Sequence, residues 1–327
     1  MAPDGRSFVT AVGLKQSSVW VRESNGKPSS PGLSHADHGT VDTNERQISL
    51  EGQAVFPKFS PDGKKLFYLA QKGTLLERSE LWMSDLETGR NEVVLPGFLL
   101  SRSLVRPYDV SPDGRNVLVQ ALDTEKKSRL WLAPLDRRTP PTPIPNVEGD
   151  SVVFGPDGEI FFRRREGDYG FAYRVRADGT GLQKASEYPV IAITGISADG
   201  QWLAVYARPD DQKAGGTLAL PLAGGSPIQI SGNMSSLEWS GDGRQLLVSI
   251  PQSTFASQAG NTYVIPLPRG RMWPTIPAGG FPSESALAAL PGVRVIPSSD
   301  VVPGPAPDVF ALTRGTAHRN LYSIPVP

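Results

Sequence analysis

The chain repeats one four-residue turn sequence, and this repeat limits the fold more than any other feature. Ser-Pro-Asp-Gly occurs at residues 60–63 and 111–114, and copies with one change occur four more times. Proline presets the second position of a tight turn, and glycine takes the left-handed conformation that closes it. Each copy is therefore predicted to join two antiparallel strands. These predicted structural turns contain Asp4 and Gly5, Asp62 and Gly63, Asp113 and Gly114, Asp157 and Gly158, Asp199 and Gly200, and Asp242 and Gly243.

The residues that follow each turn predict strands buried on both faces. The third and fourth residues after every turn glycine are apolar, as in Leu66-Phe67 and Leu246-Leu247. A strand with one face in water would alternate instead. The last four turn glycines are 42 to 44 residues apart, which suits the roughly 40–45 residues of a four-stranded propeller blade. We therefore predict an all-β protein, a β-propeller of four-stranded antiparallel blades forming one domain over residues 1–327.

Three segments depart from the repeat. Residues 28–44 are polar and turn-rich and are predicted to be a mobile insertion loop. Residues 266–300, rich in Pro, Gly and Ala, are predicted to be an irregular connection, and residues 301–327 a degenerate last blade with strands at 308–312 and 320–324. Counting that last copy predicts seven blades. Six is the alternative, because both terminal copies are incomplete and the two ends could complete one blade between them.

The amino-acid composition limits the kinds of partner that this chain is expected to bind. Lys plus Arg and Asp plus Glu both number 33, whereas nucleic-acid-binding domains usually carry a basic excess, so no nucleic acid partner is expected. No apolar run reaches about 18 residues, so we expect no membrane insertion by this chain. The N-terminal residues lack the apolar core of a signal peptide. This favours a cytoplasmic location by default, although a membrane-anchored parent protein would allow an extracytoplasmic one.

No catalytic or metal-binding motif stands out. Residues 195–199 lack the last glycine of a serine-hydrolase nucleophile elbow. His35 and His38 lie in the expected mobile loop, where a metal site would lack oriented supporting groups. The chain has no cysteine, which excludes disulfides and thiolate metal sites. We therefore expect no catalytic residue, no metal and no cofactor.

Candidate binding residues come from the first strand of each blade, which is expected to border the central channel. Charged residues occupy the position four before the turn aspartate in three of five copies, while the next residue is always apolar. Two further polar residues lie on the entry side of one of these strands. The predicted site at the channel mouth comprises Lys58, Arg106, Tyr108, Asp109 and Glu238. It would suit a protein or a small polar ligand; the alternative is that these side chains face only channel water.

Residues 56–66, Phe-Pro-Lys-Phe-Ser-Pro-Asp-Gly-Lys-Lys-Leu, resemble the WD40-like repeat of the TolB type, also called PD40. Residues 130–138 and 319–325 resemble the C-terminal propeller regions of large bacterial serine/threonine protein kinases. That resemblance implies a sensor or protein-interaction region. It does not imply kinase activity, because the glycine-rich loop, the His-Arg-Asp loop and the Asp-Phe-Gly motif are missing.

These observations favour a non-catalytic propeller that binds a ligand or a protein, as a sensor or scaffold. One alternative is an enzyme with its site at the channel mouth, such as a lactonase, cyclase or lyase. That enzyme would need several His, Glu or Asp side chains converging there, and the chain has only three histidines. Another alternative is a truncated gene product without an independent function.

Overall fold

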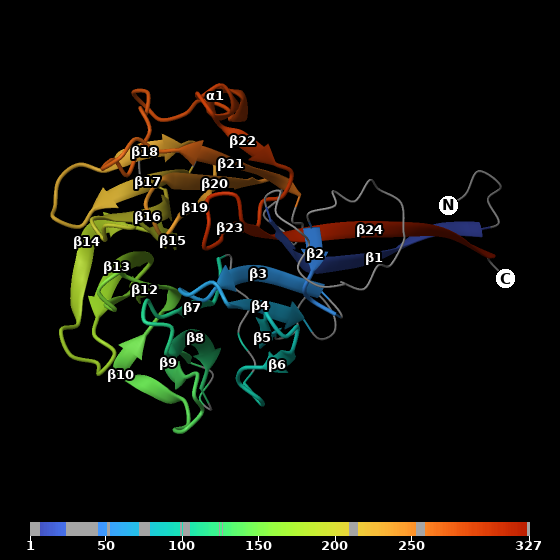
Figure 1. The fold of residues 1–327 in the computed structure, drawn as a ribbon, viewed down its shortest axis with the longest axis horizontal. Coiled ribbons are helices and arrows are strands. Elements are labelled where there is room, and N and C mark those ends of the chain that lie inside the picture. The colour runs from blue at the N-terminus through green and yellow to red at the C-terminus, as the bar shows by residue number, and fades with distance from the viewer. Residues whose placement is uncertain are drawn as a thin grey trace.

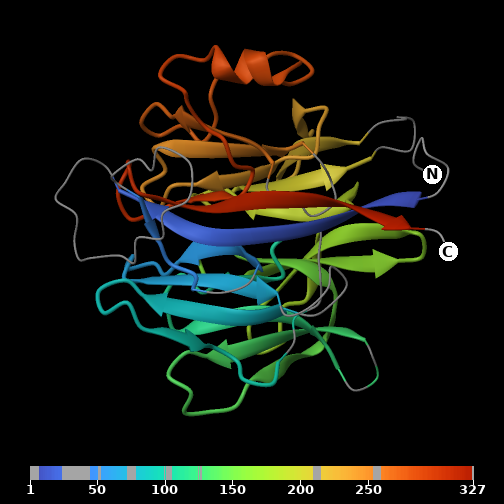
Figure 2. The same ribbon diagram turned by 90° about the vertical axis from the view of Figure 1, so that its right-hand side faces the viewer.

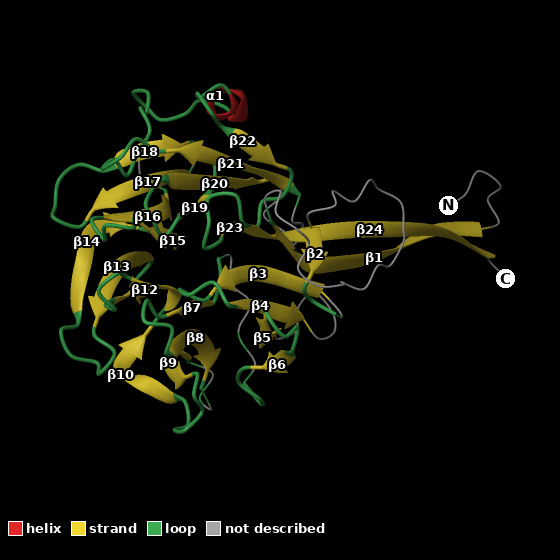
Figure 3. Cartoon of the chain, in the orientation of Figure 1, coloured by secondary structure: helices red, strands yellow, loops and turns green. Residues whose placement is uncertain are grey.

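The computed structural model describes residues 7–23, 45–50, 53–71, 79–98, 100, 105–123, 125, 127–208, 215–252 and 259–325. In these residues the chain is built almost entirely of strands arranged around a centre (Figures 1 and 3). The one helix described there, α1 (Glu284–Ala288), has five residues. No helix in the described ranges combines the length and apolar character that crossing a bilayer requires.

Four sheets contain four antiparallel strands each, taken in sequence order. We call them blades 2 to 5. Blade 2 contains β7 (Tyr108–Val110), β8 (Asn116–Leu122), β9 (Ser128–Pro134) and β10 (Thr142–Glu148). Blade 3 contains β11 (Asp150–Phe154), β12 (Ile160–Glu166), β13 (Tyr169–Val175) and β14 (Gln183–Pro189). Blade 4 contains β15 (Ala192–Ile196), β16 (Trp202–Ala207), β17 (Gly216–Pro221) and β18 (Ile228–Ser231). Blade 5 contains β19 (Ser236–Trp239), β20 (Gln245–Pro251), β21 (Gly260–Pro266) and β22 (Arg294–Ile296).

A larger sheet of eight strands consists of two four-stranded groups joined by a single parallel residue pair, Ser17 with Gln53. Blade 1 contains β3 (Gln53–Phe59), β4 (Lys65–Gln71), β5 (Ser79–Asp85) and β6 (Asn91–Val93). Blade 6 contains β23 (Val301–Pro303), β24 (Phe310–Pro325), β1 (Ser7–Arg22) and β2 (Glu45–Gln47). The two ends of the chain therefore build one blade together, in antiparallel pairing that runs from Ser7–Pro325 to Arg22–Phe310.

This arrangement differs from the expected seven blades. In the described residues, the first and last repeat copies merge into blade 6, which gives six four-stranded groups. The expected pairs of short strands at each end are single 16-residue strands, β1 and β24. Their outer halves project from the ring as a two-stranded ribbon (Figure 1), and the two strands lie side by side in the second view (Figure 2). Residues 266–300 are not wholly irregular, because they contain α1 and β22, the fourth strand of blade 5. Residues 28–44, Asp4 and Gly5 lie outside the described residues.

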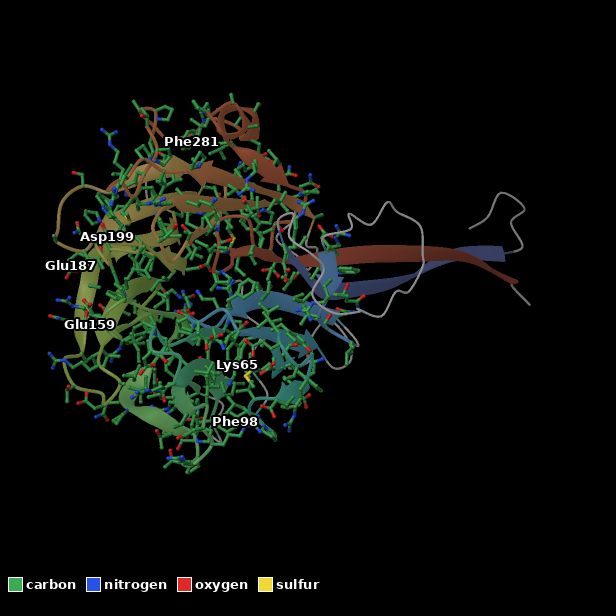
Figure 4. All side chains as sticks on the ribbon, viewed as in Figure 1. Lys65, Phe98, Glu159, Glu187, Asp199 and Phe281 are labelled. Carbon is green, nitrogen blue, oxygen red and sulfur yellow. The ribbon has the colours of Figure 1, made fainter. Side chains whose placement is uncertain are left out.

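Apolar side chains pack in six clusters, and each cluster unites two neighbouring blades. Strand β4 shows how: Phe67 and Leu69 pack toward blade 2, while Leu66 and Tyr68 pack toward blade 6. This explains the adjacent apolar residues in the sequence, because the second strand of a blade is covered on both faces. Phe98 and Phe281, labelled in Figure 4, belong to two different clusters. Burial of apolar area between blades is the main force holding the ring together.

The turns between first and second strands share one hydrogen-bond pattern. In the turn of blade 1, Gly63 N–H donates to Ser60 O at 2.8 Å, and Ser60 Oγ donates to Asp62 Oδ1 at 2.6 Å. The same serine–aspartate bond recurs in blades 2, 4 and 5. In blade 6, residues 304–307 take this place, since Gly304 N–H donates to Val309 O as Ser60 N–H does to Lys65 O.

Turns of neighbouring blades contact one another. Gly63 has φ of +70°, and a Cβ added there would lie 2.6 Å from Pro305 of the blade 6 turn. Gly158 has φ of +81°, but an added Cβ would meet nothing within 4 Å.

We therefore predict that Gly158→Ala lowers the free energy of unfolding by about 1 kcal/mol, from the left-handed conformation alone. Gly63→Ala should lower it clearly more, because the added Cβ would also clash with Pro305. Urea unfolding of both variants measures the difference. Equal losses would show that the contact between the turns of blades 1 and 6 is not tight.

An ion cluster secures blade 6. The side chain of Glu45 is 1% exposed and contacts Arg22 Nε at 3.3 Å and the guanidinium of Arg314, so it links β2 to β1 and β24. An exposed pair, Arg294 with Asp308 at 2.7 Å, provides a control. We predict that Glu45→Gln lowers the free energy of unfolding by about 2 kcal/mol, because Arg22 and Arg314 lose the buried negative charge that both contact. Asp308→Asn should cost less than about 1 kcal/mol. Chemical denaturation compares the two variants, and similar small losses would contradict the closing role of Glu45.

Candidate functional site

The first strands β3, β7, β11, β15, β19 and β23 lie around the centre of the ring (Figure 1). Equivalent register positions carry Lys58, Asp109 and Glu238, which pair with Phe67, Leu118 and Leu247 of the adjacent second strands. The three side chains therefore project from three blades at the same level. The position four before the turn aspartate thus identifies one level of the channel.

A bulge positions Lys58 within β3. The register shifts between Val55 and Lys58, and Phe56 has φ of +56°, an uncommon conformation for a bulky residue. Both polar atoms of the Phe56 backbone are held by side chains from other blades. Phe56 N–H donates to Asp300 Oδ2 at 2.7 Å, and Phe56 O accepts from the Tyr108 hydroxyl. Asp300 and Tyr108 thus stabilise the bulge that directs Lys58 into the channel.

Four charged side chains form a connected network. Lys58 Nζ lies 3.3 Å from Asp109 Oδ1 and 3.4 Å from Glu238 Oε2. Arg106 NH1 donates to Glu238 Oε1 at 2.6 Å. Blades 2 and 5 are opposite each other in the ring order, so the bond between Arg106 and Glu238 spans the channel. All four side chains are at most one-quarter exposed.

The backbone anchors the Asp109 end of the network. Asp109 Oδ1 accepts from Val110 N–H at 2.9 Å, and Oδ2 accepts from Phe154 N–H of blade 3 at 2.8 Å. Asp300, which accepts from Phe56 N–H, also accepts from Thr313 Oγ1 at 2.6 Å. A buried charge is stabilised when its oxygens are hydrogen-bonded and a cation lies nearby. The network meets this requirement through contacts that join blades 1, 2, 3, 5 and 6.

The surroundings of Glu238, Lys58 and Tyr108 shift their pKa values away from neutral pH. Burial raises the pKa of Glu238, but Lys58 and Arg106 outweigh that effect and lower it to about 2. Burial lowers the pKa of Lys58, yet Asp109 and Glu238 together raise it above its ordinary value. Burial also raises the pKa of the Tyr108 phenol well above its ordinary value. Glu238 is therefore a fixed anion and Lys58 a fixed cation across the physiological range.

A cavity of about 460 Å³ lies beside this network. Its charged side is formed by Lys58, Arg106, Asp109 and Glu238. Its other sides combine polar and apolar groups, and the apolar side chains among them are Val105, Val152, Val153, Ile193, Ile196 and Trp239. Exposed turn residues such as Pro112 and Gly241 also line it, so the cavity reaches the surface at the turn face.

Two polar atoms of the cavity lining are buried without a partner among the described residues. They are Arg106 Nε and Thr194 Oγ1. Most buried polar atoms in proteins are hydrogen-bonded, and exceptions often mark functional positions. The other hydroxyls of the lining are already used: Ser197 Oγ and Ser240 Oγ donate to their turn aspartates, and the Tyr108 hydroxyl donates to Phe56 O.

The structure brings all five predicted site residues together, since Lys58, Arg106, Tyr108, Asp109 and Glu238 all line the cavity. Sequence analysis did not find Thr194, Asp300 or Trp239. Asp300 immediately precedes β23, whose turn lacks the Asp-Gly pair, so the repeat could not be aligned there. The turn pairs from Asp62 to Gly243 lie outside the charged network, in the turns described above.

The described residues contain no group of three or more His, Cys, Asp or Glu side chains that could hold a metal ion. His35 and His38 lie outside the described residues.

The sequence matches no protein-family model. The fold resembles TolB from Acinetobacter baumannii with a TM-score of 0.55 and 19% identity over 69% of this chain; the match covers 55% of that protein's length. It resembles a putative TolB from Agrobacterium tumefaciens with a TM-score of 0.63 and 16% identity, over 93% of this chain and 99% of that one. A chain in a nidogen–laminin complex gives a TM-score of 0.50 at 11% identity, over 77% and 89% of the two chains.

These likenesses concern the fold, because all identities are low. The protein has a β-propeller fold like that of these TolB structures, which confirms the predicted fold class.

The pKa of Glu238 gives a prediction on pH and stability. A carboxyl whose pKa is about 2 when folded and near 4.5 when unfolded stabilises the fold above pH 4.5. That contribution is lost as pH falls toward 2. We expect Glu238→Gln to cost about 3 kcal/mol at pH 7, because Lys58 and Arg106 lose a buried anion, and much less near pH 3. Urea unfolding of both proteins at the two pH values measures this. A gap between them that does not change with pH would contradict the ionised state of Glu238.

Proposed function

We propose that this protein is a non-catalytic binding propeller that takes a small polar ligand, or a side chain of a partner protein, into the central cavity. The observation that carries the proposal is the convergence of four charged side chains from blades 1, 2 and 5 beside an open cavity. Binding sites commonly combine apolar walls with a few convergent polar groups, in cavities of roughly 300–1,000 Å³. This cavity has both features.

The titration behaviour of the network supports binding over catalysis. A general acid or base works best when its pKa lies near the working pH. Here the pKa of Glu238 is lowered to about 2, and the pKa values of Lys58 and Tyr108 are raised. Such groups hold fixed charges and fixed hydrogen bonds, which suits recognition.

The comparisons agree with this proposal in general terms. The fold is shared with TolB proteins and with a chain of a nidogen–laminin complex, and the latter structure is of a protein–protein assembly. The resemblance of two segments to the propeller regions of bacterial kinases fits a sensor or scaffold role. In that role the cavity would hold the signal or part of a partner.

The proposal is tested by blocking the cavity opening. Ala198 is an exposed residue of the cavity lining and lies outside the charged network, so Ala198→Trp should narrow the opening with little effect on the charges. Ala177→Trp, at an exposed turn of blade 3 outside the lining, is the matched control. Saturation-transfer NMR would screen amino acids, short peptides, monosaccharides and aliphatic acids against the unaltered protein and both variants. We expect at least one compound to lose its signal with Ala198→Trp and keep it with Ala177→Trp.

If no compound shows that pattern, the central cavity is not the binding site and the proposal fails.

A further inference from the structure

The cavity has unused hydrogen-bonding capacity mainly on its donors. Every carboxylate oxygen of Asp109 and Glu238 already accepts from, or lies beside, a donor: Val110 N–H, Phe154 N–H, Lys58 or Arg106. Arg106 carries five N–H groups, and in the described structure only its bond to Glu238 uses one of them. Its Nε has no partner there. Lys58 has three N–H groups and two carboxylate neighbours.

A ligand that complements these spare donors must bring acceptor oxygens. A carboxylate suits a guanidinium group, because two parallel N–H···O bonds can form. Glu238 contacts only NH1, so the remaining N–H groups of the guanidinium are available for a second acceptor. Thr194 Oγ1 adds another unpartnered polar atom to the same lining.

The negative charges near Arg106 bear on whether a carboxylate can bind there. Asp109, Glu238 and Asp300 are three acids near two cations, so an incoming anion would meet repulsion if all three were ionised. Burial raises the pKa of Asp300 above its ordinary value. Asp300 Oδ2 also has two donors of its own, Phe56 N–H and Thr313 Oγ1. Asp300 is not among the residues that line the cavity, so the acids that a bound carboxylate would meet there are Asp109 and Glu238, each already paired with Lys58 or Arg106.

The remaining walls define the rest of the ligand. Val152, Val153, Ile193, Ile196 and Trp239 present apolar surface in the same cavity. We infer that the cavity binds a carboxylate attached to an apolar group, with the carboxylate on Arg106 and Lys58 and the apolar group against blades 3 to 5. This inference rests on the proposed function and specifies its ligand. The carboxylate could belong to a free aliphatic acid or to the C-terminus of a partner peptide.

Pairs of acids and amides test the inference on the full chain. Hexanoate and hexanamide represent the free acid, and acetyl-Gly-Gly-Leu with a free or an amidated C-terminus represents the peptide; hexylamine serves as the cation. Titration by NMR should show at least tenfold tighter binding of an acid than of its own amide. The acid that binds more tightly identifies the source of the carboxylate. Amides that bind as well as their acids, or hexylamine that binds more tightly than hexanoate, would overturn the inference.

Two variants sharpen the test because they should act in opposite directions. Arg106→Gln removes the guanidinium group and should weaken binding of the acid at least tenfold. Arg106→Lys, which keeps the charge but not the paired N–H donors, should give an intermediate loss. Glu238→Gln removes an anion beside the site and frees a donor on Arg106, so it should tighten binding of the acid severalfold. Weaker acid binding in Glu238→Gln would contradict the inference. If Arg106→Gln does not fold, the acid–amide pairs and Glu238→Gln still decide.

The outcome separates this inference from the proposed function. Neutral compounds that bind and are excluded by Ala198→Trp would retain the cavity as the site and reject the carboxylate. Binding that ignores Ala198→Trp would reject both.

Discussion

Burial of the second strand of each blade on both faces is the constraint on which the rest of the structure depends. A sheet with apolar residues on both faces cannot stop at one neighbour, because its other face would remain in water. Leu66 and Phe67 illustrate this, since they point to opposite sides of β4 and enter different clusters. Sheets of this kind bury both faces only when each sheet has two neighbouring sheets, and a closed ring provides two neighbours for every sheet. In the described residues six apolar clusters fill the six contacts between neighbouring blades.

The channel follows from the same constraint. First strands converge at the ring centre, where side chains at one register position face each other from different blades. Three charged residues at that level are costly to bury singly. The bonds from Arg106 to Glu238 and from Lys58 to both carboxylates offset this cost, and Phe154 N–H adds a donor from blade 3. The network therefore links the blades and also gives the cavity its one charged side.

Much of this could be predicted from the sequence, because the repeat is local. The Ser-Pro-Asp-Gly turn identifies the boundary between first and second strands, and counting back four residues from its aspartate gives Lys58, Asp109 and Glu238. The number of blades could not be found this way. Pro307 stands in blade 6 where the other turns have glycine, and pairing such as that of Arg22 with Phe310, between opposite ends of the sequence, leaves no local pattern. Strand β22 was missed because it has three residues and Val295 within it is exposed.

The contacts within the network were also beyond sequence analysis. Which cation meets which carboxylate depends on the ring order, and the positive φ of Phe56 that directs Lys58 inward is set by Asp300 and Tyr108 from other blades. Thr194 had no signal at all, since it lies at a register shift in β15. Repeat patterns identify equivalent positions, whereas pairwise chemistry between blades requires their arrangement in space.

The pairing of β1 with β24 has a consequence for how the protein is made. During synthesis β1 leaves the ribosome long before β24, so blade 6 can assemble only after Phe310–Pro325 has been translated. Until then β1 is a free strand edge and the growing ring is open on one side. Such unpaired edges favour association between chains. Closure between distant segments is also slow, because the loop entropy must be lost before the contacts form. The synthesis of β24 therefore sets the earliest time at which the ring can close and the period during which β1 is exposed to aggregation.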